Sequence, residues 1–185
     1  MAKVYMFLAD GFEQTEALAP VDVLRRGGVD VVTVSISDSL WVESSHGVTV
    51  SADAMFDEIN LDDADLLMLP GGMPGSVNLD MHAGVRSALT AHAAAGKMIG
   101  AICAAPMVLG RLGLLKGKAA TCYPGFEKYL DGATYTADLV TVCGNITTGK
   151  GPAASLPYAY SLLSQLVGTE KAQEVADGMM WPSDI

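Results

Sequence analysis

Cys103 occupies the setting in this sequence that most clearly favours chemistry. The apolar run of residues 98–102 ends at this cysteine, and small residues followed by Pro106 come directly after it. A thiol on a sharp strand-to-helix turn is held above the edge of a sheet. There the positive end of the helix lowers its pKa, and backbone N–H groups face an incoming oxygen. The pattern predicts an exposed, reactive thiol, with a buried structural cysteine as the alternative.

Two other loops carry groups that could support such a thiol. Residues 10–16 include three acids directly after an apolar strand, among them Glu16, and residues 69–75 include Gly71 and Gly72. Glycine allows close approach to the backbone, so the second loop could donate N–H groups to a developing oxyanion. Acids in a first helical turn also simply favour the helix dipole, and many glycine turns only reverse the chain. Both alternatives stay open on the residues alone.

The elements that must position these loops alternate along the chain. We expect strands at 3–9, 29–36, 64–69 and 98–102, a hairpin at 41–43 and 48–50, and helices at 15–26, 85–95, 107–112, 153–167 and 170–179. Further strand-like pieces occur at 119–121, 133–136, 139–143 and 146–148, and the tail at 179–182 is expected to pack on the core or on a dimer surface. Strands that alternate with helices predict an α/β three-layer sandwich, in which helices cover both faces of a mostly parallel sheet.

The three loops are expected to meet at one edge of this sheet. Parallel sheets bind ligands outside the carboxyl ends of the strands, where the strand order reverses. The loop at 10–16 follows the first predicted strand, the loop at 70–75 follows the third and Cys103 follows the fourth. Their convergence would place a thiol, acids and backbone donors around one pocket.

Composition limits the class of protein. The 185 residues are 50% hydrophobic with a net charge of −10, which fits one globular domain and argues against electrostatic binding of nucleic acid or an anionic membrane. No apolar run reaches membrane-spanning length, and no cleavable leader is evident. The three cysteines form no CxxC pair and no zinc spacing, which favours free thiols in a reducing cytosol. Cys122 and Cys143 are expected to be packing thiols, with a resolving role open for either if it approaches Cys103.

Five pieces of sequence occur in a recognisable order and together span nearly the whole chain: residues 10–16 (DGFEQTE), 21–28 (VDVLRRGG), 69–72 (LPGG), 101–106 (AICAAP) and Gly151-Pro152. In combination they resemble the ThiJ/PfpI superfamily, in the branch of the parkinsonism-associated DJ-one protein. The resemblance implies one ThiJ/PfpI-like domain, of class I glutamine amidotransferase-like type, over residues 1–185, with a flavodoxin-like sandwich. It also implies a homodimer that requires no cofactor and no metal.

The same resemblance pairs the cysteine with a carboxyl group, and Glu16 is the matching position. Burial beside a thiolate disfavours an ionised carboxyl, so the pKa of Glu16 should rise. A protonated Glu16 could donate a hydrogen bond to the sulfur and favour the thiolate, and the two groups would titrate as one coupled system. Gly72 and Ala104 are the expected backbone donors to an oxyanion. Further pocket residues are expected at Gly71, Tyr123 and Pro152.

Histidine placement limits the analogy to hydrolases. Many relatives carry a histidine at the position of Tyr123, so a Cys–His pair of that kind is unavailable here. The peptidase-like branch places a histidine directly after the cysteine, where this chain has Ala104. His46 lies in the predicted hairpin turn, where it is either solvated or within reach of a dimer partner. His82 and His92 are expected on helix surfaces.

The resemblance implies a glyoxalase-type or deglycase-type enzyme that acts on small reactive carbonyls, for example from methylglyoxal to lactate. The Cys103 thiolate would attack the aldehyde carbon, and Glu16 would move a proton between adjacent carbons. The alternative is a redox sensor or stress chaperone in which Cys103 is oxidised to sulfinic acid without substrate turnover. The residues do not separate these two. Amidase or peptidase activity is disfavoured by the missing histidine, and nothing identifies a site for thiazole-phosphate biosynthesis.

Overall fold

A seven-stranded sheet forms the centre of the protein in a computed structural model, which describes residues 1–182. The strand order is β10-β11-β7-β6-β1-β2-β5, and neighbouring strands are parallel except β10 and β11. The strands are β1 (Lys3–Leu8), β2 (Asp30–Ser35), β5 (Ala54–Met55), β6 (Leu66–Leu69), β7 (Met98–Ile102), β10 (Val140–Cys143) and β11 (Ile146–Gly149). The order reverses between β1 and β6, which is the position where such sheets bind ligands.

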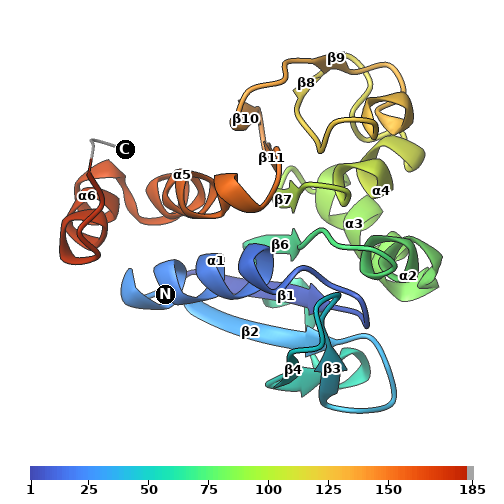
Figure 1. Ribbon diagram of the computed structural model, residues 1–185, viewed down its shortest axis with the longest axis horizontal. Helices are drawn as coiled ribbons and strands as arrows, with labels where there is room; N and C mark the ends of the chain where they lie inside the picture. The colour runs from blue at the N-terminus through green and yellow to red at the C-terminus, as the bar shows by residue number, and fades with distance from the viewer. Residues whose placement is uncertain (183–185) are drawn as a thin grey trace.

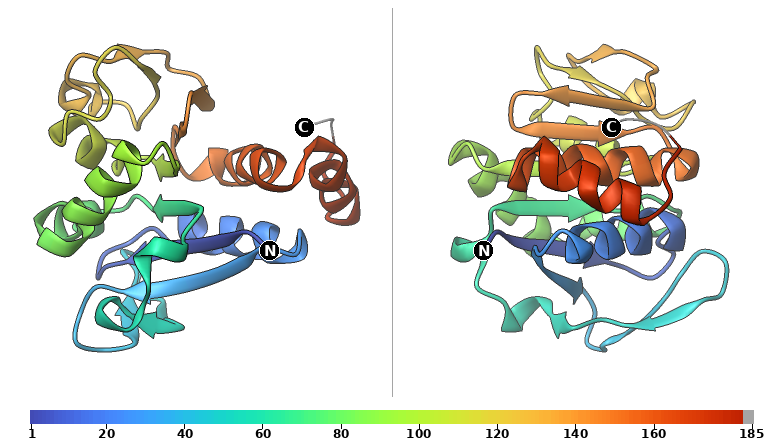
Figure 2. Two further views of the ribbon diagram at one scale, coloured as in Figure 1. Left: turned by 180° about the vertical axis from the view of Figure 1, so that it is seen from behind. Right: turned by 90° about the vertical axis from the view of Figure 1, so that its left-hand side faces the viewer.

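Helices cover both faces of this sheet and enclose a hydrophobic core on each side (Figure 1, Figure 2). Along β1, Met6 and Leu8 enter one core while Tyr5 and Phe7 enter the other, because successive side chains of a strand point to opposite faces. The first core lies under α1 (Gln14–Arg26), α5 (Ser155–Val167) and α6 (Thr169–Gly178). The second lies under α2 (Gly75–Met81), α3 (Ala83–Ala94) and α4 (Pro106–Arg111).

Shorter pieces complete the described chain outside the central sheet. β3 (Trp41–Glu43) and β4 (Thr49–Ser51) form an antiparallel hairpin, and β8 (Ala119–Ala120) pairs in parallel with β9 (Thr134–Tyr135). Single 3-10 turns are η1 (Phe56–Glu58), η2 (Leu61–Asp63), η3 (Glu127–Tyr129) and η4 (Pro152–Ala154). No described helix has both the length and the apolar character needed to cross a bilayer.

The predicted three-layer α/β sandwich is confirmed, with differences in particular elements. The sequence did not indicate α2 or β5, and the strand-like pieces at 119–121 and 133–136 pair with each other instead of joining the central sheet. The sequence of α2, GSVNLDM, is rich in residues of modest helix propensity and reads as a loop. His92 was expected on a helix surface, and this is wrong: it faces the second core with Val85 and Leu89, and burial lowers its pKa.

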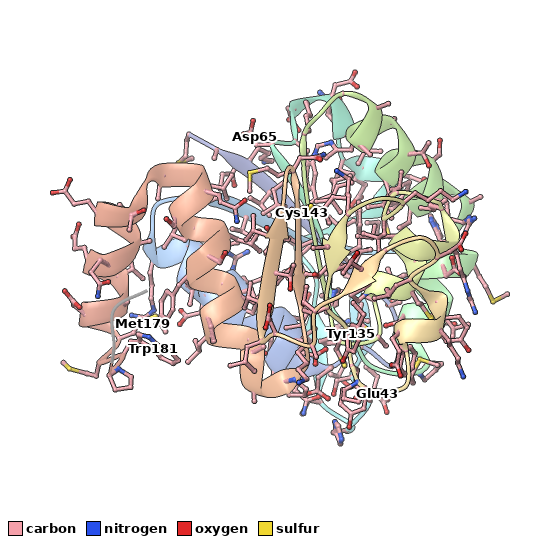
Figure 3. The ribbon with its side chains drawn as sticks, turned by 90° about the horizontal axis from the view of Figure 1, so that it is seen from above. Glu43, Asp65, Tyr135, Cys143, Met179 and Trp181 are labelled. Carbon is pink, nitrogen blue, oxygen red and sulfur yellow. The ribbon has the colours of Figure 1, made fainter. Side chains whose placement is uncertain are left out.

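The end of the chain packs on the first core, which was one of the two expectations for residues 179–182. The ring of Trp181 lies 5.5 Å from that of Tyr160, and the Tyr160 hydroxyl donates to the Met179 sulfur at 3.5 Å. Figure 3 shows Met179 and Trp181 side by side next to the two C-terminal helices. Residues 183–185, which the predicted domain includes, lie outside the described residues.

Candidate active site

Cys103 lies on a sharp turn between β7 and α4. Its φ is 64°, in the left-handed region that side chains other than glycine rarely adopt. Neighbouring loops hold this conformation from both sides: the Cys103 N–H donates to the Gly149 carbonyl at 2.8 Å, and the Tyr123 N–H donates to the Cys103 carbonyl at 2.9 Å. A strained residue that its surroundings fix in place is the geometry by which a turn presents a nucleophile.

Glu16 lies beside this thiol, in the first turn of α1. Its side chain is fully buried, and its Oε2 accepts a hydrogen bond from the Gly71 N–H at 2.9 Å. Gly71 is required here because a Cβ at that position would overlap the Glu16 carboxyl and the Cys103 side chain. Burial, with a smaller contribution from the charge of Glu13, raises the pKa of Glu16 to about 7, while the Cys103 and Gly71 hydrogen bonds act in the opposite direction. The predicted rise in this pKa is confirmed.

The surroundings of Cys103 correct the expectation of an exposed thiol with a lowered pKa. The residue is 9% exposed, and burial together with the adjacent Glu16 carboxyl raises the pKa of the thiol. The N–H groups of Gly72 and Ala104 interact with the sulfur and act in the opposite direction. The thiol and the carboxyl are in contact and titrate as one coupled pair.

A cavity of about 480 Å³ opens over Cys103 and Glu16. The loops that follow β1, β6 and β7 all contribute to it, so the three loops meet at the sheet edge as expected. The pocket residues named from the sequence are gathered here; those that line the cavity directly are Gly72, Ala104, Tyr123 and Pro152. Gly71 does not line the cavity itself, but its N–H donates a hydrogen bond to Glu16. The cavity thus has the thiol at its floor and an exposed aromatic ring, that of Tyr123, at its edge.

Three polar residues of the cavity were not assigned to it from the sequence: Glu13, Ser45 and His46. The Nδ1 atom of His46 lies 3.2 Å from Glu13 Oε2 and 3.1 Å from Ser45 Oγ. His46 therefore lines the cavity of its own chain, which the sequence did not predict. Glu13 and Ser45 are 32 residues apart, and no local pattern indicates that the hairpin folds over the loop after β1.

The site is equipped for covalent and proton-transfer chemistry. It combines a thiol, an acid–base group with a pKa of about 7 and N–H donors that converge on the sulfur. Such a set can bond to an electrophilic carbon and move protons around it. Within residues 1–182, no group of three or more His, Cys, Asp or Glu side chains is arranged to hold a metal ion.

Comparison with known proteins agrees with this geometry. Residues 2–165 match the DJ-1/PfpI family. The chain belongs to the DJ-1/PfpI family. Protein DJ-1 homolog B of Arabidopsis thaliana is 40% identical over 176 residues, which are 94% of this chain and 40% of that protein. A Pyrococcus abyssi protein named as a deglycase is 33% identical over 153 residues, which are 81% of this chain and 90% of that protein.

Solved structures of the DJ-1/PfpI family share the whole fold. The structure of oxidized DJ-1 from Toxoplasma gondii superposes with a TM-score of 0.95 at 34% identity and covers 99% of this chain and 100% of that one. This confirms the flavodoxin-like sandwich that the resemblance implied. The chain spans less than half the length of the two Arabidopsis DJ-1 homologues that it matches, 40% and 44%.

Tyr123 contributes an aromatic ring to the edge of the cavity. Its ring packs edge-on against that of Phe126, with the centroids 6.5 Å apart. The titratable neighbour of the thiol is instead Glu16, which comes from α1 on the other side of the cavity. The side chain placed to exchange a proton with Cys103 is therefore a carboxyl.

Neither of the other two thiols lines the cavity. Cys122 is fully buried, as expected for a packing thiol, and burial raises its pKa to about 12. Cys143 is paired through β11 with the beginning of β7, whereas Cys103 follows the end of that strand. Figure 3 shows Cys143 far from Glu43, the last residue of β3, whose hairpin lines the cavity through Ser45 and His46. Cys143 is therefore not placed to resolve an oxidised Cys103.

Proposed function

We propose that this protein is a cofactor-independent enzyme that acts on small reactive carbonyl compounds, with Cys103 as the nucleophile and Glu16 as the proton carrier. The observation that carries the proposal is the contact between the thiol and a buried carboxyl with a pKa of about 7, at the floor of a cavity. A pKa near the working pH suits a group that must both accept and return a proton. The relative named as a deglycase supports carbonyl chemistry of this class.

The first step forms a bond between the sulfur and the substrate, here methylglyoxal. The Glu16 carboxylate takes the thiol proton while the sulfur of Cys103 attacks the aldehyde carbon, C1. The aldehyde oxygen, O1, becomes negative and is stabilised by the N–H groups of Gly72 and Ala104. O1 then receives the proton from Glu16, which leaves a neutral hemithioacetal and restores the carboxylate.

The second step is an internal oxidation and reduction. Glu16 removes the hydrogen of C1 as a proton, which gives an enediol, and then returns it to C2, while the hydroxyl proton of O1 is replaced by one on the oxygen of C2. C1 is thereby oxidised and C2 is reduced with no external electron acceptor. The result is a thioester of Cys103. Water hydrolyses this thioester, which releases lactate and restores the thiol.

Lactate formation from methylglyoxal, without an added thiol, tests the proposal. The Cys103→Ala variant should lose about a hundredfold or more because the covalent route disappears. Glu16→Gln should lose about 10²- to 10⁴-fold because the proton carrier is removed. Cys143→Ser is the matched control and should keep full activity, since its thiol lies away from the cavity. A wild-type protein that produces no lactate would refute the proposal.

Redox sensing is the second candidate, because a solved relative is described as oxidized. In that case peroxide should add two oxygen atoms at Cys103 while Cys122 and Cys143 stay unmodified, and the wild type should show no turnover. Suppression of client aggregation that survives Cys103→Ala would instead favour chaperone action without thiol chemistry. Mass spectrometry and light scattering on the same preparations separate the three outcomes.

A further inference from the structure

His46 and Glu13 form an ordered pair in the cavity that the steps above do not use. The His46 side chain is 67% exposed, whereas that of Glu13 is 11% exposed. The imidazole thus stands at the mouth of the cavity while the carboxyl that holds it is buried. A histidine oriented by a buried carboxylate is a common arrangement of acid–base groups in enzymes.

The turn that carries His46 is fixed to the loop after β1. The Ser45 N–H donates to the Phe12 carbonyl and the Gly11 N–H donates to the Glu43 carbonyl, both at 2.8 Å. The backbones of Phe12 and Ser44 also form an isolated parallel bridge. His46 therefore keeps its place relative to Glu16, although it comes from a hairpin outside the central sheet.

Hydrogen bonds also fix the position of Glu13, and its two carboxyl oxygens have different partners. Its N–H donates to the Gly71 carbonyl at 2.9 Å, and its Oε1 accepts from the Thr15 N–H at 3.3 Å as the cap of α1. Its Oε2 faces His46 and Ser45. One oxygen thus holds the helix, and the other holds the imidazole in the cavity.

The chemistry under "Proposed function" needs two proton movements, and Glu16 supplies one of them. Conversion of the hemithioacetal into the thioester moves a proton from C1 to C2. It also moves a proton from O1 to O2, the oxygen on C2, because O1 ends as a carbonyl and O2 as a hydroxyl. While Glu16 holds the carbon-derived proton, it cannot carry the other.

We propose that His46, oriented by Glu13, carries the proton between the two substrate oxygens. As Glu16 removes the C1 proton, the imidazolium of His46 donates a proton to O2 and the enediol forms. As Glu16 protonates C2, the neutral imidazole takes the proton of O1 and the thioester carbonyl forms. Both side chains finish as they began, and protons and electrons balance. The inference rests on the proposed function and adds a second catalytic residue to it.

A chemical rescue experiment tests this role. His46→Gly should lower kcat for lactate formation by about a hundredfold, with little change in KM, because an acid–base group is lost. Imidazole added to the solution should restore part of the activity, since the mouth of the cavity is open. Glu13→Gln should give a smaller loss of kcat, on the order of tenfold, because it leaves the imidazole poorly oriented. His82→Asn is the control histidine variant: it lies outside the cavity, asparagine preserves its capping of α3, and activity should stay at the wild-type level.

The rate at which iodoacetamide alkylates Cys103 separates a chemical role from a structural one. It should be unchanged in His46→Gly, because His46 does not act on the sulfur. Turnover within about threefold of wild type in that variant would overturn the inference and leave the proposed function standing. A loss of turnover that imidazole does not restore, accompanied by an equal loss of alkylation rate, would also overturn it. A wild-type protein without turnover would remove both.

Discussion

Burial raises the pKa values of the two titratable groups at the centre of the site, Glu16 and Cys103. The sequence allowed the raised pKa of Glu16 to be predicted, because any carboxyl packed beside a thiol loses water. It did not show that burial raises the pKa of the Cys103 thiol as well. How deep a thiol lies depends on loops from elsewhere in the chain, here the segments around Gly149 and Tyr123 that bind its backbone.

Glu16→Gln should change how stability depends on pH. The pKa of Glu16 rises from 4.5 to about 7 on folding, so between these values the folded protein keeps a proton that the unfolded chain releases. The stabilising effect is complete below about pH 4.5 and is lost as the pH rises through 7. Relative to the variant, the free energy of unfolding of the wild type should fall by about 3 kcal/mol over this interval. Urea unfolding at a series of pH values measures the difference, and two parallel curves would contradict it.

At the scale of elements, the sequence predicted the positions of those strands and loops for which a general rule connects a local sequence pattern to a place in the fold. Apolar runs located the central strands, and the rule for parallel sheets brought the loops after β1, β6 and β7 to one edge. The rule does not extend to pieces outside the sheet. The hairpin of β3 and β4 reaches the cavity through backbone bonds to residues 11 and 12, and nothing local in residues 41–51 indicates those partners. His46 was missed for this reason.

Asp80 should stabilise the helices that follow two of the site loops. Its side chain, on α2, is 10% exposed and pairs with Arg86 on α3 and with Arg111 on α4, the latter at 2.6 Å. Asp80→Ala should lower the free energy of unfolding by about 1–3 kcal/mol, because it leaves two arginines without their nearly buried partner. Thermal or urea unfolding measures this loss. Glu174→Ala is the control: its pair with Lys171 is exposed, and its removal should change stability by less than about 0.5 kcal/mol. Equal effects of the two variants would contradict the prediction.

At the scale of the whole molecule, family membership followed from five short pieces of sequence, four of which contribute residues to the cavity or its wall, while residues 21–28 end α1 away from it. No short sequence motif indicates the oligomeric state or the cellular location in the same way. The homodimer follows from the resemblance alone, and the cytosolic location follows from the number and spacing of the cysteines. Both stay predictions.

The protein should form a homodimer in solution. Large apolar side chains stand exposed on the β3–β4 hairpin, with Trp41 at 65% and Val48 at 45%, and a second copy would remove such surface from water. Sedimentation equilibrium should give twice the 19.2 kDa of one chain. A single-chain mass at micromolar concentration would contradict the expectation.

The hairpin of β3 and β4 also bears on how such a site can diversify. It carries His46 to the cavity while contributing no strand to the central sheet. Sequence changes at its tip can therefore retune reactivity or preference without disturbing the scaffold that holds sulfur and carboxyl together. Exchange of the β3–β4 hairpin between relatives is accordingly a direct way to change the chemistry of the site while the central sheet and its helices stay the same.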